Sequence, residues 1–265
     1  MACAGEQGPE ATTATGLDLA PPFEHHAALF LDVDGTLLDI AARPQDVSLR
    51  PGLVRILGGL RQVMPVVLIS GRRIADLDRL FAPLILPAAG QHGAERRAIG
   101  GETSRLDLPR AALEQARDRL QHWAQAHPGI LVEDKGATLA LHYRRAPRLA
   151  AEATQAAREA VERLGPRYTL VPGAMVCEIR PSGCDKGRAI AEFLAEPACA
   201  GRRPCFIGDD TTDEDGFALV NRLGGCSIKV GPGPSVARWR FPGVDEVLAW
   251  LERYARWLQQ DTHCE

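Results

Sequence analysis

The chain has 265 residues, a formal net charge of −3 and 45% hydrophobic residues. This balance is ordinary for a globular protein and lacks the basic excess of a nucleic-acid surface, so we expect no nucleic acid as a partner. No apolar stretch approaches the ~20 residues of a membrane-spanning helix, and we expect no membrane contact. The length predicts one large domain or a core domain that carries a smaller one.

The N-terminal segment and the cysteines indicate the compartment. The start, MACAGEQGPEATTATG, lacks a basic stretch followed by an apolar run, so we expect no signal peptide and interpret residues 1–22 as a disordered leader. The seven cysteines are odd in number and contain no Cys-x-x-Cys pair, which argues against a disulfide framework and a zinc cluster. Reduced thiols in a cytoplasmic protein are the expected state.

The first elements alternate between strand and helix. An apolar strand over residues 27–31 ends at Asp32, and a helix over 52–60 follows it. A second apolar strand over 65–70 leads through Gly71 into another helix. Strands that are apolar throughout and alternate with helices are typical of a parallel sheet covered on both faces.

The alternation of strands and helices changes after residue 106. The order becomes αββαββ, with helices and strand pairs expected over 108–127, 130–134, 137–143, 149–164, 168–172 and 174–180. Turns are expected at Lys135-Gly136 and at Pro172-Gly173. This pattern predicts a compact α+β module, residues 107–180, inserted into the α/β domain.

The alternation of helices and apolar strands resumes at Asp185. Further helices and strands are expected over 185–196, 204–210, 215–223, 226–231 and 244–258. We therefore predict a Rossmann-like parallel-sheet core, residues 23–106 and 181–265, which carries the inserted module as an α+β cap.

Carboxylates follow two of the predicted strands. Asp32 and Asp34 come directly after the first strand, and Asp209 and Asp210 stand at the carboxyl end of the strand expected over 204–210. Ligands bind at the carboxyl ends of strands in open parallel sheets, and clustered acids there need a cation or a proton. Mg²⁺ prefers oxygen ligands and shares them with phosphate, so the pattern predicts a magnesium-dependent phosphatase.

The motif DVDGT, residues 32–36, suits two-step phosphoryl transfer. One carboxylate would attack phosphorus, and the other would protonate the leaving oxygen and later activate water. Gly35 allows a tight turn whose backbone N–H groups, with Thr36, would hold phosphoryl oxygens. The alternatives are an acidic surface loop and a structural cation site.

Two further segments would support the phosphate. Ser70 and Gly71 follow the second strand, where a hydroxyl and a helix start would meet the anion, although an ordinary helix cap is the alternative. Lys186 begins the helix after the insert and would offset negative charge. In GDDTTDEDGF, Asp209 is the expected side-chain metal ligand, while Asp210 or Asp213 would orient metal-bound water.

These pieces together resemble the haloacid dehalogenase-like phosphatases, through DVDGT, SGR (70–72), Lys186 and GDDTTD (208–213). Within that superfamily, residues 24–256 resemble the trehalose-phosphatase family. The motifs of this narrower resemblance are GQHGAERR (90–97), VEDKG (132–136), ALHYRRAP (140–147) and MVCEIRPSGCDKG (175–187).

The resemblance implies Asp32 as the nucleophile and Asp34 as the general acid and base. It implies a Mg²⁺ ion held by Asp32, the backbone carbonyl of Asp34 and Asp209, with Ser70 and Lys186 on the phosphate. Sugar selection would come from the cap residues Glu133, Lys135 and Glu178. Further substrate-side candidates are Arg72, His92 and His142.

The expected activity is therefore hydrolysis of trehalose 6-phosphate through an aspartyl-phosphate intermediate, with a functional link to a trehalose-phosphate synthase. One alternative is a phosphatase of another sugar phosphate, such as sucrose phosphate or mannosyl-phosphoglycerate. The other is a non-catalytic regulator that binds a sugar phosphate; such a protein should lack one of the two motif aspartates, and this chain retains both.

Overall fold

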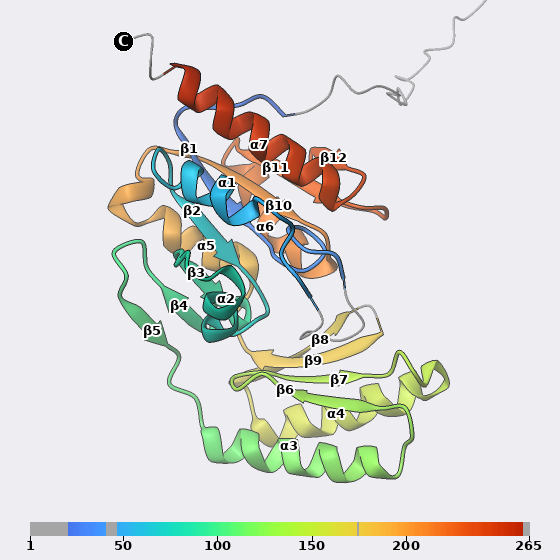
Figure 1. The fold of residues 1–265 in the computed structure, drawn as a ribbon. Coiled ribbons are helices and arrows are strands. Elements are labelled where there is room, and N and C mark those ends of the chain that lie inside the picture. The colour runs from blue at the N-terminus through green and yellow to red at the C-terminus, as the bar shows by residue number, and fades with distance from the viewer. Residues whose placement is uncertain (1–20, 41–46, 174, 262–265) are drawn as a thin grey trace, which may run out of the picture.

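A computed structural model describes residues 21–40, 47–173 and 175–261. Residues 1–20 of the expected leader lie outside the described residues. Over the described part, the strands form an eight-stranded sheet and a four-stranded sheet, which lie one above the other in Figure 1. Within these ranges, no helix has the length and apolar character needed to cross a membrane.

The larger sheet is built around β1 (Ala27–Leu31). This strand runs parallel to β2 (Val66–Ile69) on one side and to β10 (Arg203–Gly208) on the other, so strands far apart in the sequence become neighbours. The sheet order is β12-β11-β10-β1-β2-β3-β4-β5. Its remaining strands are β3 (Ala88–Gly90), β4 (Glu95–Arg97), β5 (Thr103–Arg105), β11 (Cys226–Val230) and β12 (Trp239–Phe241). The parallel part predicted from the sequence is confirmed, and β4 and β5 extend it as antiparallel strands.

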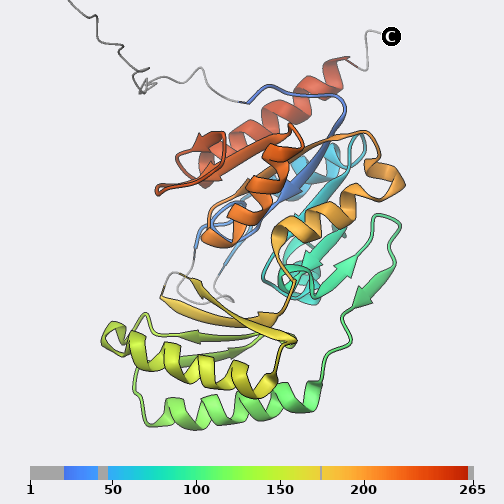
Figure 2. The same cartoon turned by 180° about the vertical axis from the view of Figure 1, so that it is seen from behind.

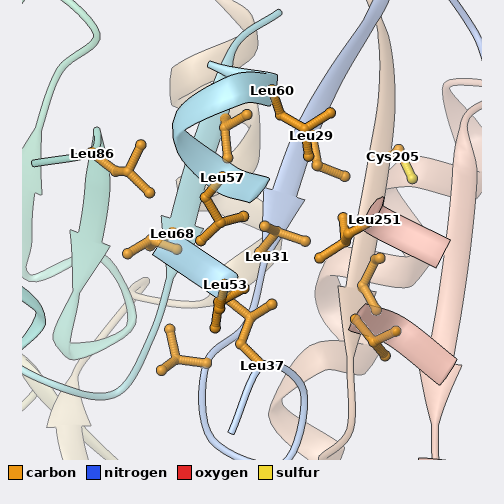
Figure 3. Packing of buried hydrophobic residues seen from close by; sticks show 14 of the residues in the cluster. Leu29, Leu31, Leu37, Leu53, Leu57, Leu60, Leu68, Leu86, Cys205 and Leu251 are labelled. Carbon is orange, nitrogen blue, oxygen red and sulfur yellow. The ribbon is translucent and has the colours of Figure 1, made fainter. Parts of the chain in front are cut away.

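Helices cover both faces of this sheet, because successive side chains of each strand point to opposite sides. Leu29 and Leu31 of β1 pack on one side with buried side chains of α1, α2 and α7. Figure 3 shows leucines of β1, α1 and α7 packed together there. Ala28 and Phe30 pack on the other side with α5 and α6. The helix bounds are α1 Leu53–Leu60, α2 Ile74–Phe81, α5 Lys186–Leu194, α6 Glu214–Arg222 and α7 Val244–Asp261.

The smaller sheet has the order β6-β7-β9-β8 and carries two helices on one face. Its elements are α3 (Arg110–Gln125), β6 (Leu131–Asp134), β7 (Leu139–His142), α4 (Ala150–Leu164), β8 (Tyr168–Gly173) and β9 (Val176–Pro181). Figures 1 and 2 show α3 and α4 on the side away from the larger sheet, so the open face of the smaller sheet points toward the larger one.

The α/β class, the parallel core and the αββαββ order are therefore confirmed, and one local prediction is wrong. Pro172 and Gly173 belong to β8 and do not form the turn before β9. Gly173 still pairs with Val176 in the ladder, and Met175, directly before β9, has a φ of 60°.

Candidate active site

A buried network joins the ends of β1 and β10 to the start of α5. The Nζ of Lys186 lies 2.7 Å from Oδ1 of Asp32 and 2.5 Å from Oδ1 of Asp213. The other oxygen of Asp32 accepts a hydrogen bond from the Thr36 hydroxyl at 3.2 Å. All four side chains are buried, so the charges of Asp32, Asp213 and Lys186 are stabilised by one another and by hydrogen bonds rather than by water.

The loop after β10 is shaped by Asp213, which is completely buried. Its Oδ2 accepts hydrogen bonds from the backbone N–H groups of Asp209, at 2.9 Å, and Asp210, at 2.8 Å. Asp210 and Asp213 together form a capping box at the start of the short helix Thr211–Asp213. Asp213 therefore connects Lys186 to the loop that carries Asp209, whereas Asp210 serves as a helix cap.

Gly35 allows the two acidic loops to approach each other. Its φ is 83°, and a Cβ atom at this position would overlap the carboxylate of Asp209. Asp32, Asp209 and Asp213 each offer a carboxylate oxygen within 4.8 Å of the others. The glycine of DVDGT is therefore required both by the turn and by the close contact between the loops.

The charges of this cluster are incompletely balanced. Burial raises the pKa of Asp32 well above its ordinary value, and the ammonium of Lys186 opposes that rise. Burial and the neighbouring Asp213 raise the pKa of Asp209 to about 6. Burial alone would lower the pKa of Lys186, but the carboxylates of Asp213 and Asp32 raise it above its ordinary value. Three carboxylates thus share one cation, and an additional divalent cation fits this donor set.

Asp34 lies beside this cluster and is held by an arginine. Arg72 donates to both carboxylate oxygens of Asp34, from Nε at 2.7 Å and from Nη2 at 2.6 Å. The backbone N–H of Arg72 donates to the buried Ser70 hydroxyl at 3.1 Å, which fixes that loop. At Gly71 an added Cβ would come within 2.9 Å of Nε2 of His92. The SGR segment therefore joins the acidic site to the loop after β3.

The inner face of the smaller sheet brings further predicted residues to this place. Glu178 of β9 is only 8% exposed, and its Oε1 accepts a hydrogen bond from Nζ of Lys135 at 2.9 Å. Its Oε2 lies 3.0 Å from Nε2 of His92, a residue of the larger sheet's side. Although burial acts to raise the pKa of Glu178, His92 and Lys135 hold it well below its ordinary range. This carboxylate therefore connects the two sheets.

Glu133 and His142 form a second polar pair on the same sheet. The Nε2 of His142 lies 2.9 Å from Oε2 of Glu133, and both side chains are partly exposed. The hydrogen bond from His142 lowers the pKa of Glu133, with a further contribution from Lys135. The predicted cap residues thus form two adjoining groups, one buried around Glu178 and one more open around Glu133.

Three residues at this site were not identified from the sequence. Lys229 of β11 is buried, and its Nζ donates to the backbone carbonyls of Asp209 and, at 3.0 Å, Val230. A lysine inside the apolar strand CSIKV was the available signal. Arg73 and Gln91 bind the backbone of the β6–β7 turn. They gave no local signal, because their partners are distant in the sequence.

The chain is similar to known trehalose-phosphatases. The trehalose-phosphatase family model matches residues 30–241, which is most of the chain. The trehalose-6-phosphate phosphatase of Escherichia coli strain K12 is 42% identical over 242 residues, and the match covers 91% of each chain.

Two solved structures extend the comparison. The C-terminal domain of the Candida albicans trehalose-6-phosphate phosphatase has a TM-score of 0.76 at 25% identity and covers 87% of this chain and 93% of its own. The C-terminal domain of the C. albicans trehalose synthase regulatory protein has a TM-score of 0.66 at 16% identity, covering 86% of this chain and 94% of its own. At that identity the second match shows the fold alone. From the family match over residues 30–241 and the identity to the E. coli enzyme, this chain belongs to the trehalose-phosphatase family.

Proposed function

We propose that the protein hydrolyses trehalose 6-phosphate to trehalose and phosphate, with Mg²⁺ as cofactor and an aspartyl phosphate on Asp32 as intermediate. The observation that carries the proposal is the buried network of Asp32, Lys186 and Asp213 beneath Glu178 and Lys135. The network offers a nucleophile and a phosphate-binding cation, and the side chains above it offer hydrogen bonds to a sugar.

The donor set fits Mg²⁺. Asp32 and Asp209 would hold the ion through their carboxylates, together with the backbone carbonyl of Asp34. Asp213 is less suited to direct coordination, because it already accepts three hydrogen bonds, two of them on Oδ2, whereas Asp32 accepts one on each oxygen. When bound, the ion would supply the positive charge that these carboxylates and a phosphate share.

In the first step, an oxygen of Asp32 attacks phosphorus and the bond between phosphorus and the sugar oxygen breaks. Asp34 gives its proton to that departing oxygen. In the second step, Asp34 takes a proton from water, whose oxygen attacks phosphorus and releases Asp32 and inorganic phosphate. Arg72 donates one hydrogen bond to each oxygen of Asp34, which favours the ionised carboxylate and leaves a second lone pair on each oxygen for the proton.

Binding of the phosphate would involve groups around the same loops. Lys186 and the Ser70 hydroxyl would contact phosphoryl oxygens, aided by the backbone N–H groups of Gly35, Thr36 and Gly71. Lys186 keeps its charge for this purpose, because two carboxylates raise its pKa.

Sugar selection would come from residues 107–180, which we propose act as a cap. Glu178 and Lys135 would meet sugar hydroxyls above the phosphate, with Glu133, His142 and His92 near them. Their present contacts are two hydrogen bonds, Lys135 to Glu178 and His142 with Glu133, and a close polar contact of His92 with Glu178, all of which hydroxyl groups can replace. Closure of the cap would exclude bulk water from the aspartyl phosphate.

Two alternatives make different predictions. A phosphatase of sucrose phosphate or mannosyl-phosphoglycerate would use the same core chemistry with another preference at the cap. A regulatory protein would bind a sugar phosphate without turning it over. The fold alone does not distinguish such a protein from an enzyme, because the C-terminal domain of the C. albicans trehalose synthase regulatory protein has a similar fold. The presence of both Asp32 and Asp34 favours catalysis.

The metabolic setting is also a proposal. A trehalose-phosphate synthase would supply the substrate, because this reaction consumes a disaccharide that is already phosphorylated. A reducing, cytoplasmic compartment is consistent with Cys177, Cys184, Cys199, Cys205 and Cys226, which are all free.

The test is phosphate release with Mg²⁺ across a panel of trehalose, sucrose and glucose 6-phosphates and mannosyl-phosphoglycerate. We expect the highest kcat/KM on trehalose 6-phosphate, loss of activity with a chelator, and trapping of phosphate on the protein only when Asp32 is present. An Asp32→Asn variant that keeps wild-type turnover would refute the mechanism. Equal kcat/KM values for glucose 6-phosphate and trehalose 6-phosphate would refute the substrate assignment alone.

A further inference from the structure

The turn between β6 and β7 is bound to the larger sheet's side through its backbone. One guanidinium, that of Arg73, donates from Nε to the carbonyl of Lys135 at 2.6 Å and from Nη2 to the carbonyl of Asp134 at 3.0 Å. Arg73 directly follows the SGR segment and precedes α2. Two successive carbonyls of the turn are thus held by one planar group, whose fixed, paired N–H donors a lysine ammonium does not offer.

A second residue binds the other end of this turn. The Oε1 of Gln91 accepts a hydrogen bond from the backbone N–H of Ala137 at 2.6 Å. Gln91 is 1% exposed and has a φ of 50°, an uncommon conformation for a residue other than glycine. Its own N–H donates to the carbonyl of Arg72 at 2.9 Å. The surrounding contacts therefore impose this conformation, which directs the side chain at the turn.

Gly136 lets the turn come this close. Its φ is 96°, and an added Cβ would lie 3.2 to 3.3 Å from atoms of the Arg73 guanidinium. The side chain of Asp134 adds a weaker contact, with Oδ1 3.7 Å from Nη2 of Arg73. The docking thus rests on three backbone hydrogen bonds, a glycine that admits the arginine, and a charged pair.

This turn carries a residue that the proposed function uses. Lys135 lies within the turn that Arg73 and Gln91 bind, and its Nζ reaches Glu178 at 2.9 Å. Since Arg73 and Gln91 hold the backbone before and after Lys135, they fix where its ammonium lies relative to the loops that carry Ser70 and His92.

We propose that Arg73 and Gln91 are specificity-positioning residues: they dock the β6–β7 turn on the core so that Lys135 and Glu178 are placed over the sugar of the substrate. This inference rests on the proposed function of the cap residues. Neither residue needs to contact the substrate. Their contribution should therefore appear for substrates that reach the cap and be absent for small phosphate esters that react in the core alone.

The experiment compares kcat/KM for trehalose 6-phosphate and for p-nitrophenyl phosphate, whose small leaving group does not span to the turn. Arg73→Ala and Gln91→Gly should each lower the first value on the order of 5- to 30-fold, as expected for one or two lost hydrogen bonds. The value for p-nitrophenyl phosphate should change by less than about twofold in each variant. Glycine is used at position 91 because it accepts a positive φ without steric cost.

Conservative variants test the contacts themselves. Gln91→Glu keeps an acceptor oxygen for the Ala137 N–H and should restore most of the selectivity. Arg73→Lys keeps the charge but not the paired donors, and should stay impaired. The matched control is Arg117→Ala, which removes an ion pair to the same Asp134 from within α3, at 3.2 Å, and should leave both substrates unaffected.

Three results would overturn the proposal. One is an unchanged kcat/KM for trehalose 6-phosphate in Arg73→Ala and Gln91→Gly. Another is an equal loss on both substrates, which would mean general damage to the core. The third is a Gln91→Glu variant as impaired as Gln91→Gly. The wild-type preference for trehalose 6-phosphate over glucose 6-phosphate tests the proposed function separately, because it does not depend on either substitution.

Discussion

The ammonium of Lys186 lies 2.7 Å from Oδ1 of Asp32, although 154 positions separate the two residues in the chain. Asp32 follows the central strand of the larger sheet, and Lys186 is the first residue of α5, just after the smaller sheet ends. Folding of the core therefore has to bring together two segments on either side of a long insertion before this charge pair exists.

Removal of that ammonium should impair chemistry and stability together. In Lys186→Met the buried carboxylates of Asp32 and Asp213 lose their shared cation. We expect kcat to fall about 10²- to 10³-fold and the free energy of unfolding to fall by about 3–5 kcal/mol at pH 7. Steady-state kinetics and urea unfolding measure the two effects. Arg188→Met, on the exposed side of the same helix, is the control, and unchanged kcat in Lys186→Met would contradict the assignment.

Gly35→Ala should weaken the response to Mg²⁺, because the new methyl group would occupy the space of the Asp209 carboxylate. We expect the half-saturating Mg²⁺ concentration to rise on the order of tenfold or more, consistent with a ligand displaced from its position. The matched control is Gly231→Ala. Gly231 also has a positive φ, 74°, but has nothing within 4 Å of its added Cβ, so this variant carries the backbone strain without the overlap. Equal Mg²⁺ requirements in the two variants would refute the prediction.

Glu178 should contribute stability that depends on pH. Its pKa in the folded protein lies below the ordinary 4.5, so the unfolded chain binds the proton more readily. The contribution is fully present above pH 4.5 and is lost as the pH falls through the folded-state pKa. We expect Glu178→Gln to lower the melting temperature at pH 7, and the difference from wild type to narrow below pH 4.5. Glu162→Gln, on the exposed face of α4, is the control substitution, and a difference between Glu178→Gln and wild type that widens in acid would contradict the sign.

Lys229 should matter although it touches no predicted substrate position. Its ammonium holds the backbone carbonyl of Asp209, and Lys229→Met removes that donor while keeping an unbranched side chain one atom shorter. We expect kcat/KM to fall about tenfold, with the loss reduced at high Mg²⁺ because the displaced ligand can be recovered by mass action. A loss that is independent of Mg²⁺ concentration would show that the lysine supports folding rather than the position of Asp209.

The sequence pattern predicted the core well where a strand is buried on both faces. The runs around Leu29 and Val67 are apolar throughout, and the acids that follow β1 and β10 lie together at the carboxyl edge of the sheet. The short strands β3, β4, β5 and β12 were not predicted. Three residues such as Ala88–Gly90 are too few to show a period, and their pairing is decided by the neighbouring strand.

The face of β9 shows a different limit. Alternation along β9 puts Cys177 and Ile179 in the core of the smaller sheet and Glu178 on the opposite face, but alternation alone does not distinguish a solvated face from one covered by the larger sheet. The contacts of Glu178 with His92 and of Gln91 with Ala137 join segments that have no local relation in the chain. Such contacts depend on how the two sheets meet, which is a property of the whole fold.

The return path from the smaller sheet has a mechanical consequence. β9 ends at Pro181 and α5 begins at Lys186, so only residues 182–185 separate a strand of the smaller sheet from the lysine that holds Asp32. A connection this short leaves little slack between the two. Rotation of the smaller sheet would therefore displace Lys186 itself, and a few residues added to this link should reduce that coupling while leaving each sheet intact.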